Sequence, residues 1–172
     1  MNHDSYDEDY IRGILTGVTS IAIVGASENP VRPSYFVVKY LIGKGYKVFP
    51  VNPGLAGKEL LGVKCFATLF DIPVPVDMVE VFRNSQAALA ITQDAIKIGA
   101  KVIWMQLTVR NDEAAAMAEA AGLKVVMNRC PKIEYGKLSG ETNWAGINSG
   151  SISNARGKLG ATGMQNRLLG KQ

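Results

Sequence analysis

The chain reads Ile21-Ala22-Ile23-Val24-Gly25-Ala26-Ser27 and continues Glu28-Asn29-Pro30-Val31-Arg32-Pro33-Ser34. The unbroken apolar run before Gly25 is typical of a buried parallel strand, and Ser34 after a proline is a fair N-cap for a following helix. A strand, a tight turn and a helix leave backbone N–H groups at the positive end of a helix dipole, and such an end attracts phosphate. The stretch therefore predicts a phosphate-binding turn at Gly25, Ala26 and Ser27.

The turn carries only part of the glycine fingerprint that binds dinucleotides. Gly25 fills the first glycine position, but Ser27 and Pro30 stand where the second and third glycines would fall. A glycine after a strand is also common in α/β proteins of other kinds. Taken alone, the stretch leaves a phosphate site and a purely structural turn both open.

The composition indicates one globular domain. The chain has 172 residues, of which 47% are hydrophobic and 20% charged, enough for one core and too few for two ordinary domains. Its net charge of +4 comes from scattered basic residues, which suits a small anionic ligand and argues against a nucleic-acid partner. No segment is long enough to cross a bilayer, so we expect no membrane partner.

Two further features bear on compartment and chemistry. Cys65 and Cys130 have no metal or disulfide spacing, and the acidic N-terminus is unlike a secretory leader, so we expect a cytoplasmic protein. His3 is the only histidine and stands in a terminus that we expect to fray. This argues against a histidine base or a phosphohistidine, and favours a protein without catalysis of its own.

Five apolar strands alternate with helices along the chain. We expect strands at 20–24, 46–52, 76–82, 101–107 and 123–128, and helices at 6–16, from Ser34 to near Gly43, at 85–98 and at 111–121. Asp77 and Glu80 interrupt the third strand, so we interpret it as an outer strand. The alternation predicts a single α/β domain: a Rossmann-type, doubly wound sheet of about five parallel strands with helices on both faces.

The chain divides into three parts on this reading. Residues 1–19 hold an N-terminal helix, residues 20–135 form the Rossmann-type domain, and residues 136–172 form a basic tail rich in Gly, Ser and Asn. We expect the tail to be mobile or draped on a partner, with Trp144 and Ile147 anchoring its start.

Ligands of such sheets lie across the carboxyl ends of the strands. An acidic residue that would hold the adenine ribose of NAD is absent at the second strand end, where Asn52 stands instead; this argues against NAD and leaves NADP and coenzyme A.

Phe82 and Arg83 have two possible roles at the end of the third strand. They would sandwich an adenine ring and bind a phosphate, or they are a core phenylalanine and a surface arginine. Lys58 lies on the ligand side if Asn52 does, and is otherwise a solvated loop lysine. The strand ends as a set are small, amidic, cationic and aromatic: Gly25 to Ser27, Asn52 and Pro53, Phe82 and Arg83, Gln106, and Asn128 to Cys130.

Several ordered motifs together resemble the small stand-alone CoA-binding proteins. They are 21–27, Arg32-Pro33-Ser34, 48–53, 57–62, 81–84 and Asn128-Arg129-Cys130-Pro131. These proteins are similar to the N-terminal CoA-binding domain of the succinyl-CoA synthetase alpha subunit and of ADP-forming acyl-CoA synthetases. Over about residues 10–135, the resemblance implies coenzyme A or an acyl-CoA as ligand. It places the diphosphate on the Gly25 turn, adenosine near Asn52, Pro53, Phe82 and Arg83, and the pantetheine arm toward Gln106 and 128–131.

The departures from the synthetases limit what is carried over. The phosphohistidine and the nucleotide-grasping domain of those enzymes have no counterpart here, so the resemblance implies binding and not ligase chemistry. A partner enzyme or a homo-oligomer is compatible with this. An NAD(P)-binding oxidoreductase or redox sensor is the alternative function. Cys130 either forms a mixed disulfide with the CoA thiol, held by Arg129, or simply closes the fifth strand.

Overall fold

The computed structural model describes residues 1–140, and its centre is a five-stranded parallel sheet. The strands lie in the order β2-β1-β5-β6-β7, and this confirms the predicted doubly wound sheet. Their bounds are β1 Ser20–Val24, β2 Lys47–Val51, β5 Met78–Val81, β6 Val102–Met105 and β7 Lys124–Val126.

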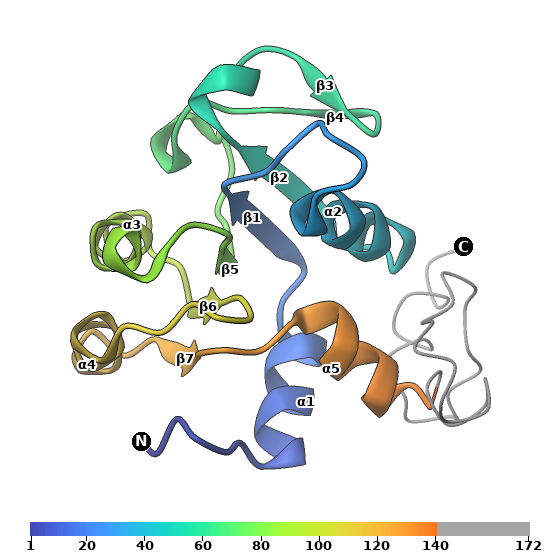
Figure 1. Cartoon of the computed structure of the whole chain (residues 1–172). Helices are drawn as coiled ribbons and strands as arrows, with labels where there is room; N and C mark the ends of the chain where they lie inside the picture. The colour runs from blue at the N-terminus through green and yellow to red at the C-terminus, as the bar shows by residue number, and fades with distance from the viewer. Residues whose placement is uncertain (141–172) are drawn as a thin grey trace.

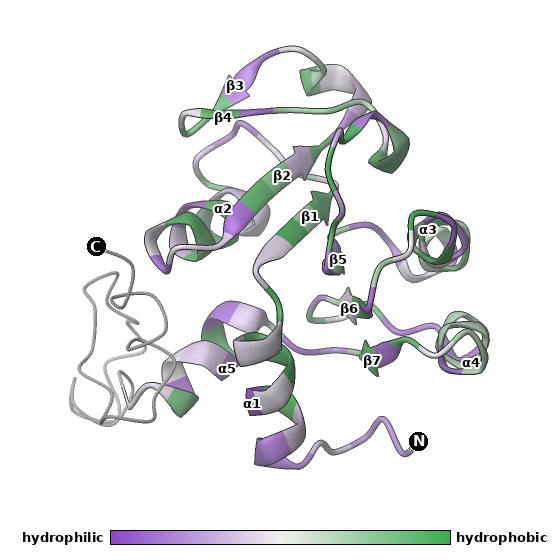
Figure 2. Cartoon of the chain, turned by 180° about the vertical axis from the view of Figure 1, so that it is seen from behind, coloured by the Kyte–Doolittle hydropathy of each residue, from purple (hydrophilic) through white to green (hydrophobic). Residues whose placement is uncertain are grey.

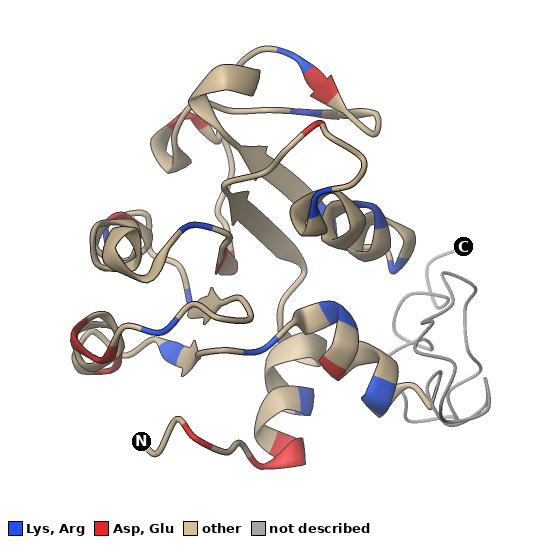
Figure 3. Ribbon diagram, viewed as in Figure 1, with Lys and Arg blue, Asp and Glu red and all other residues tan. Residues whose placement is uncertain are grey.

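Helices cover both faces of this sheet (Figure 1). On one face lie α1 (Glu8–Gly17), α2 (Pro33–Gly43) and α5 (Pro131–Leu138), and on the other lie α3 (Ser85–Lys97) and α4 (Asp112–Ala120). Two clusters of buried apolar side chains correspond to these two interfaces. Figure 2 shows strand β1 mainly in the hydrophobic colour, whereas Figure 3 shows most of the charged residues on helices and loops around the sheet.

The strand order reverses at β1, because the chain adds β2 on one side of β1 and the later strands on the other. From β1 it passes through α2 to β2 on one side, and it then returns to build β5, β6 and β7 on the other side of β1. In open parallel sheets the carboxyl ends of the two strands at such a reversal splay apart and leave a crevice. The ends of β1 and β5 are therefore where a ligand site is expected.

A small excursion covers part of the outer edge of β2. It holds two 3-10 turns, Pro53–Leu55 and Leu69–Asp71, and the antiparallel pair β3 (Glu59–Leu60) and β4 (Val63–Lys64). Phe66 joins the sheet beside Val51, and its N–H donates to the oxygen of Pro50 at 2.9 Å.

The third predicted strand is central rather than outer, so our interpretation of it was wrong. In β5, Glu80 lies between Ile23 of β1 and Trp104 of β6, and its side chain is fully buried. Burial raises the pKa of the Glu80 carboxyl well above its ordinary value of 4.5, and a hydrogen bond from Gln106 only partly offsets this. A carboxyl that keeps its proton can occupy a core position that an ionised one could not.

Asp77 comes just before β5 and ties together the amino ends of the strands. Its carboxylate accepts hydrogen bonds from Thr19, from Ser20 and, at 2.7 Å, from the Lys101 ammonium. Partial burial alone would raise the pKa of Asp77, but these bonds outweigh it and hold the pKa well below its ordinary value. The acidic residue that suggested an outer strand thus fastens three strand starts together.

The N-terminal segment packs on the sheet instead of fraying. The Tyr10 hydroxyl donates to the oxygen of Val125 and accepts from its N–H, and the Tyr6 hydroxyl accepts from the N–H of Met127. His3 is buried, with Nδ1 2.9 Å from the Tyr6 hydroxyl. The expectation that His3 lies in a frayed terminus was therefore wrong, because these tyrosines anchor the segment along β7.

The predicted tail begins inside a helix. Residues 136–138 form the end of α5, and Tyr135 and Leu138 are buried. The remainder of the predicted tail, residues 141–172 with Trp144 and Ile147, lies outside the described residues.

Candidate functional site

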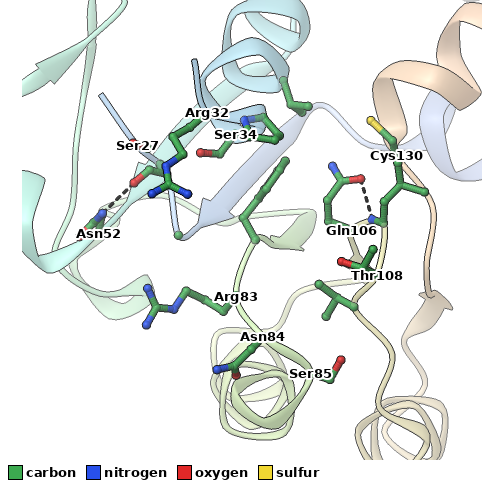
Figure 4. A pocket seen from close by; sticks show the side chains of 17 residues that line it. Ser27, Arg32, Ser34, Asn52, Arg83, Asn84, Ser85, Gln106, Thr108 and Cys130 are labelled. Atoms are coloured by element: carbon green, nitrogen blue, oxygen red, sulfur yellow. Dashed lines mark hydrogen bonds between the residues drawn. The ribbon is translucent and has the colours of Figure 1, made fainter. Parts of the chain in front are cut away.

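An open cleft of about 900 Å³ lies at the carboxyl edge of the sheet, where β1 and β5 end (Figure 4). It is lined by the turn after β1, by the start of α2, and by the segments that follow β2, β5, β6 and β7. The lining residues are Gly25, Ala26, Ser27, Arg32, Pro33, Ser34, Val37, Asn52, Phe82, Arg83, Asn84, Ser85, Gln106, Leu107, Thr108, Val109 and Cys130.

Glycine is required at position 25 for two reasons. Its φ of +95° lies in the left-handed region that side chains disfavour. A Cβ there would also lie 2.8 Å from the oxygen of Phe82 and 2.9 Å from Cδ of Arg83. Gly25 therefore allows β1 to turn while the exit of β5 crosses directly over it.

The turn after Gly25 offers free backbone donors. The N–H of Gly25 itself donates to the oxygen of Val51, whereas the N–H groups of Ser27, which is partly exposed, and of Ala26, which is buried at the base of the cleft, have no hydrogen-bond partner among residues 1–140. The Ser27 hydroxyl accepts from the N–H of Asn29 at 3.2 Å and so shapes the loop. Unpaired amides in a turn ahead of a helix are suited to an anion.

The start of α2 differs by one residue from the prediction. Pro33 is the first helical residue and Arg32 is the N-cap, without a side-chain capping bond; Ser34 is buried within the first turn. Proline favours this position because its fixed φ suits a helix start and its missing N–H costs no bond there. The N-terminus of α2, at the edge of the cleft, is therefore not closed by a capping side chain.

Asn52 holds the turn in place. Its Nδ2 donates to the oxygen of Ala26 at 2.7 Å, and its Oδ1 accepts from the N–H of Gly54 at 2.9 Å. An aspartate could not donate to Ala26, so this position needs an amide for a structural reason as well. The side chain that we expected near a ribose is thus engaged in positioning the phosphate turn.

Two arginines face the cleft without an ionic partner. Arg32 and Arg83 are exposed, form no ion pair with any of residues 1–140, and extend toward the cleft from opposite sides (Figure 4). They are the only charged residues among the described residues that line it. Guanidinium groups placed in this way can bind phosphate oxygens with two parallel hydrogen bonds.

The other end of the cleft is polar but uncharged. Gln106 donates from Nε2 to Oε1 of Glu80 at 3.0 Å and accepts the N–H of Leu107 at 2.8 Å. Cys130 is the N-cap of α5 and is almost fully buried. Burial raises the pKa of the Cys130 thiol, although the N–H groups of Ile133 and Lys132 and the Gln106 side chain lower it in part. The thiol is therefore neutral at rest.

Four residues from the predicted set do not line this cleft. Pro53 lines a neighbouring hollow with Asn52 and Arg83. Lys58 pairs with Glu28 at 3.5 Å. Asn128 accepts the N–H of Thr108 through Oδ1. Arg129 turns away to donate to the oxygen of Asp4 and lies 5.5 Å from the Tyr6 ring centre.

Ten of the fourteen predicted residues do meet around the cleft, and others join them that the sequence reasoning passed over. Asn84 and Ser85 follow Arg83 directly, with Asn84 as the N-cap of α3. Thr108 follows Gln106 and has a φ of +68°. Adding the two residues that follow Arg83 and the two that follow Gln106 would have found all three. The missed residues that line the cleft are Pro33, Val37, Asn84, Ser85, Leu107, Thr108 and Val109.

The described part of the chain lacks two other kinds of feature. No group of three or more His, Cys, Asp and Glu side chains there could hold a metal ion. None of the described helices combines the length and the apolarity that a membrane span requires.

The parallel sheet with its cleft at the strand reversal defines a Rossmann-type domain of the kind that carries a ligand at its carboxyl edge. Within that class the chain belongs to the CoA binding domain family, whose sequence model matches residues 19–136.

Relatives of two kinds share this domain. The chain is 37% identical over 125 residues to the uncharacterized protein YneT of Bacillus subtilis (strain 168), covering 73% of this chain and 91% of that protein. The solved structure of a hypothetical protein from Pyrococcus horikoshii OT3 has a TM-score of 0.75 and 41% identity, covering 80% of this chain and 96% of that one. The ADP-forming acetate–CoA ligase of Methanocaldococcus jannaschii is 25% identical over 96 residues, which make up 56% of this chain and only 13% of the ligase.

Proposed function

We propose that the cleft binds coenzyme A or an acyl-CoA, as a binding module without catalysis of its own. The diphosphate would sit on the Gly25 turn, the phosphorylated adenosine would lie toward Arg83 and the hollow beside Pro53, and the pantetheine arm would run toward Gln106 and Cys130. Membership of the CoA binding domain family supports the choice of ligand.

The observation that carries the proposal is the set of unused donors at one end of the cleft. The N–H groups of Ala26 and Ser27 and the guanidinium groups of Arg32 and Arg83 all lack a protein partner among residues 1–140. Coenzyme A carries a diphosphate and a separate ribose phosphate, so it offers acceptors for both the backbone donors and the arginines. In the described chain neither a carboxylate nor a histidine lines the cleft, which supports binding rather than acid–base catalysis.

The proposal extends to a partner and a compartment. A binding module without chemistry needs a separate enzyme that supplies or consumes the bound CoA species, and we propose such an enzyme, or a second copy of this chain, as its partner. Cys65 and Cys130 are both free thiols in the structure, which is in keeping with a reducing cytoplasm.

Isothermal titration calorimetry tests the ligand. Coenzyme A should bind, 3′-dephospho-coenzyme A should bind more weakly, and NADP should neither bind comparably nor compete. Arg83→Ala should weaken coenzyme A binding about 10- to 100-fold, the value of a charge-assisted hydrogen bond. Arg12→Ala is the matched control, because Arg12 is a partly exposed arginine on α1 that pairs with Glu8 and does not line the cleft.

Two results would overturn the proposal. One is an absence of heat on titration with coenzyme A at millimolar concentration. The other is equal weakening by the Arg83 and Arg12 variants, which would mean that binding depends on net charge rather than on this cleft.

A further inference from the structure

The two ends of the cleft differ in charge. Arg32 and Arg83 lie at the end formed by the Gly25 turn, and they are the only charged side chains that line the cleft among residues 1–140. The opposite end is lined by Gln106, Thr108 and Cys130 with neighbouring apolar residues, and it holds no cation within the described chain. A ligand with phosphates at one end and an uncharged group at the other matches this division.

The Gln106 amide at the neutral end is fixed in orientation. Its oxygen accepts the N–H of Leu107 at 2.8 Å, and its Nε2 donates to Oε1 of Glu80 at 3.0 Å. Reversing the amide would set its NH2 group against the N–H of Leu107, donor against donor. Gln106 is therefore held in one orientation by these two bonds, and its side chain is near enough to Cys130 to lower the pKa of that thiol in part.

The carboxyl of Glu80 stands directly behind this amide. Glu80 is fully buried, and its Oε2 has no hydrogen-bond partner in the described structure. A buried carboxyl of this kind stays protonated, since an unpaired charge in a core is costly. A ligand carboxylate at the same end would make the ionisation of Glu80 still less favourable. That carboxylate would also find no cationic side chain to pair with.

We propose that this end of the cleft, formed by Gln106, Thr108 and Cys130 and backed by Glu80, accepts the free thiol or a thioester of a small uncharged acyl group, and excludes an acyl group that carries a carboxylate. This inference rests on the proposed function, and it specifies the class of acyl group that the same site accepts. Glu80 acts here as a positioning residue, through the amide of Gln106.

The exclusion has a physical cause in the recessed position of the end. Gln106 is 6% exposed and Cys130 is 8% exposed, so a group that touches both is shielded from water on their side, while Thr108 at the same end is exposed. A carboxylate one methylene beyond the thioester carbonyl would lie beside them. It would lose part of its hydration and gain no ion pair, which disfavours binding.

Titration of acetyl-CoA and malonyl-CoA against the full chain tests the proposal. The two thioesters differ by one carboxylate. Coenzyme A and acetyl-CoA should bind within about threefold of each other, and malonyl-CoA should bind at least about tenfold more weakly, a difference of about 1.4 kcal/mol.

A positive charge placed at this end should shift the binding preference toward malonyl-CoA. Thr108 is exposed on the cleft, so Thr108→Lys adds a cation beside Gln106 without disturbing Glu80. It should strengthen malonyl-CoA binding relative to acetyl-CoA, and Thr108→Gln, of similar length but neutral, is the matched comparison: the malonyl-to-acetyl affinity ratio of the lysine variant should exceed that of the glutamine variant. Circular dichroism establishes that both variants are folded.

The outcomes separate the two proposals. If none of the three CoA species binds, the proposed function fails and this inference fails with it. If coenzyme A binds but malonyl-CoA binds as tightly as acetyl-CoA, only the inference about the acyl group is overturned. The ratio measured on the wild type decides this even if a variant does not fold.

Discussion

Replacing Glu80 by glutamine should change how the stability of the protein depends on pH. Burial raises the pKa of Glu80 well above its ordinary value of 4.5, against the smaller lowering by the Gln106 hydrogen bond. The unfolded chain therefore loses this proton near its ordinary pKa, while the folded protein keeps it to higher pH. The stabilisation from this group is fully present below pH 4.5 and is lost as the pH rises toward the pKa of the folded state.

The magnitude follows from the linkage between proton binding and folding. Each pH unit across that window costs about 1.4 kcal/mol of unfolding free energy. Glu80→Gln retains an oxygen that accepts from Gln106 but cannot ionise. The stability of the variant minus that of the wild type should therefore increase with pH, with a slope of up to about 1.4 kcal/mol per unit.

Urea denaturation followed by far-UV circular dichroism measures this difference between about pH 4 and about pH 8. Glu113→Gln, which removes an exposed carboxylate from the first turn of α4, is the control and should track the wild type. Parallel curves for Glu80→Gln and the wild type would refute the reasoning, because they would mean that the folded protein holds Glu80 ionised at no cost.

Three further substitutions have effects that urea denaturation can measure. Gly25→Ala should destabilise the fold by about 1–2 kcal/mol, from the left-handed backbone alone, and more from the approach to Phe82; wild-type stability in this variant would contradict the account of the turn. Asp77→Asn should cost about 1–3 kcal/mol near neutral pH through the lost Lys101 pair and the weakened N–H bonds. Because the pKa of Asp77 is lowered in the fold, its stabilisation is present above the ordinary value of 3.8 and is lost as the pH falls, so the deficit should shrink in acid; a deficit that is constant with pH would count against it. Thr108→Gly should stabilise by about 0.5–1 kcal/mol by relieving a β-branched residue at φ +68°, and a loss of stability would show that the Thr108 side chain contributes more than its strain costs.

The strands were predictable because their signal is local. An unbroken apolar run such as 21–24 marks a buried strand wherever it lies in the sheet, and an asparagine cap such as Asn111 marks a helix start from its own neighbours. The carboxyl ends of parallel strands share one edge, so eight of the ten predicted residues in the cleft came together from strand positions, while Arg32 and Ser34 belong to the start of α2.

The sequence could not supply the three-dimensional environment of each side chain. Glu80 reads as a surface residue because its charge state depends on burial, and burial depends on the strand order, which no local pattern records. Arg129 follows β7 as Arg83 follows β5, yet it points elsewhere because Asn128 takes a φ of +53° and turns the chain. Such differences are decided by single backbone angles and tertiary contacts.

The tyrosines along β7 have a consequence for how copies of this chain can meet. A bare edge strand is a template on which another chain can continue a sheet, and many proteins aggregate in this way. Here the Tyr10 hydroxyl occupies both polar groups of Val125, and Tyr6 takes the N–H of Met127, while on the far side Phe66 occupies the oxygen of Pro50. Sheet extension at β7 is thereby blocked, and Tyr10→Phe is the change that would reopen this edge to a second copy of the chain.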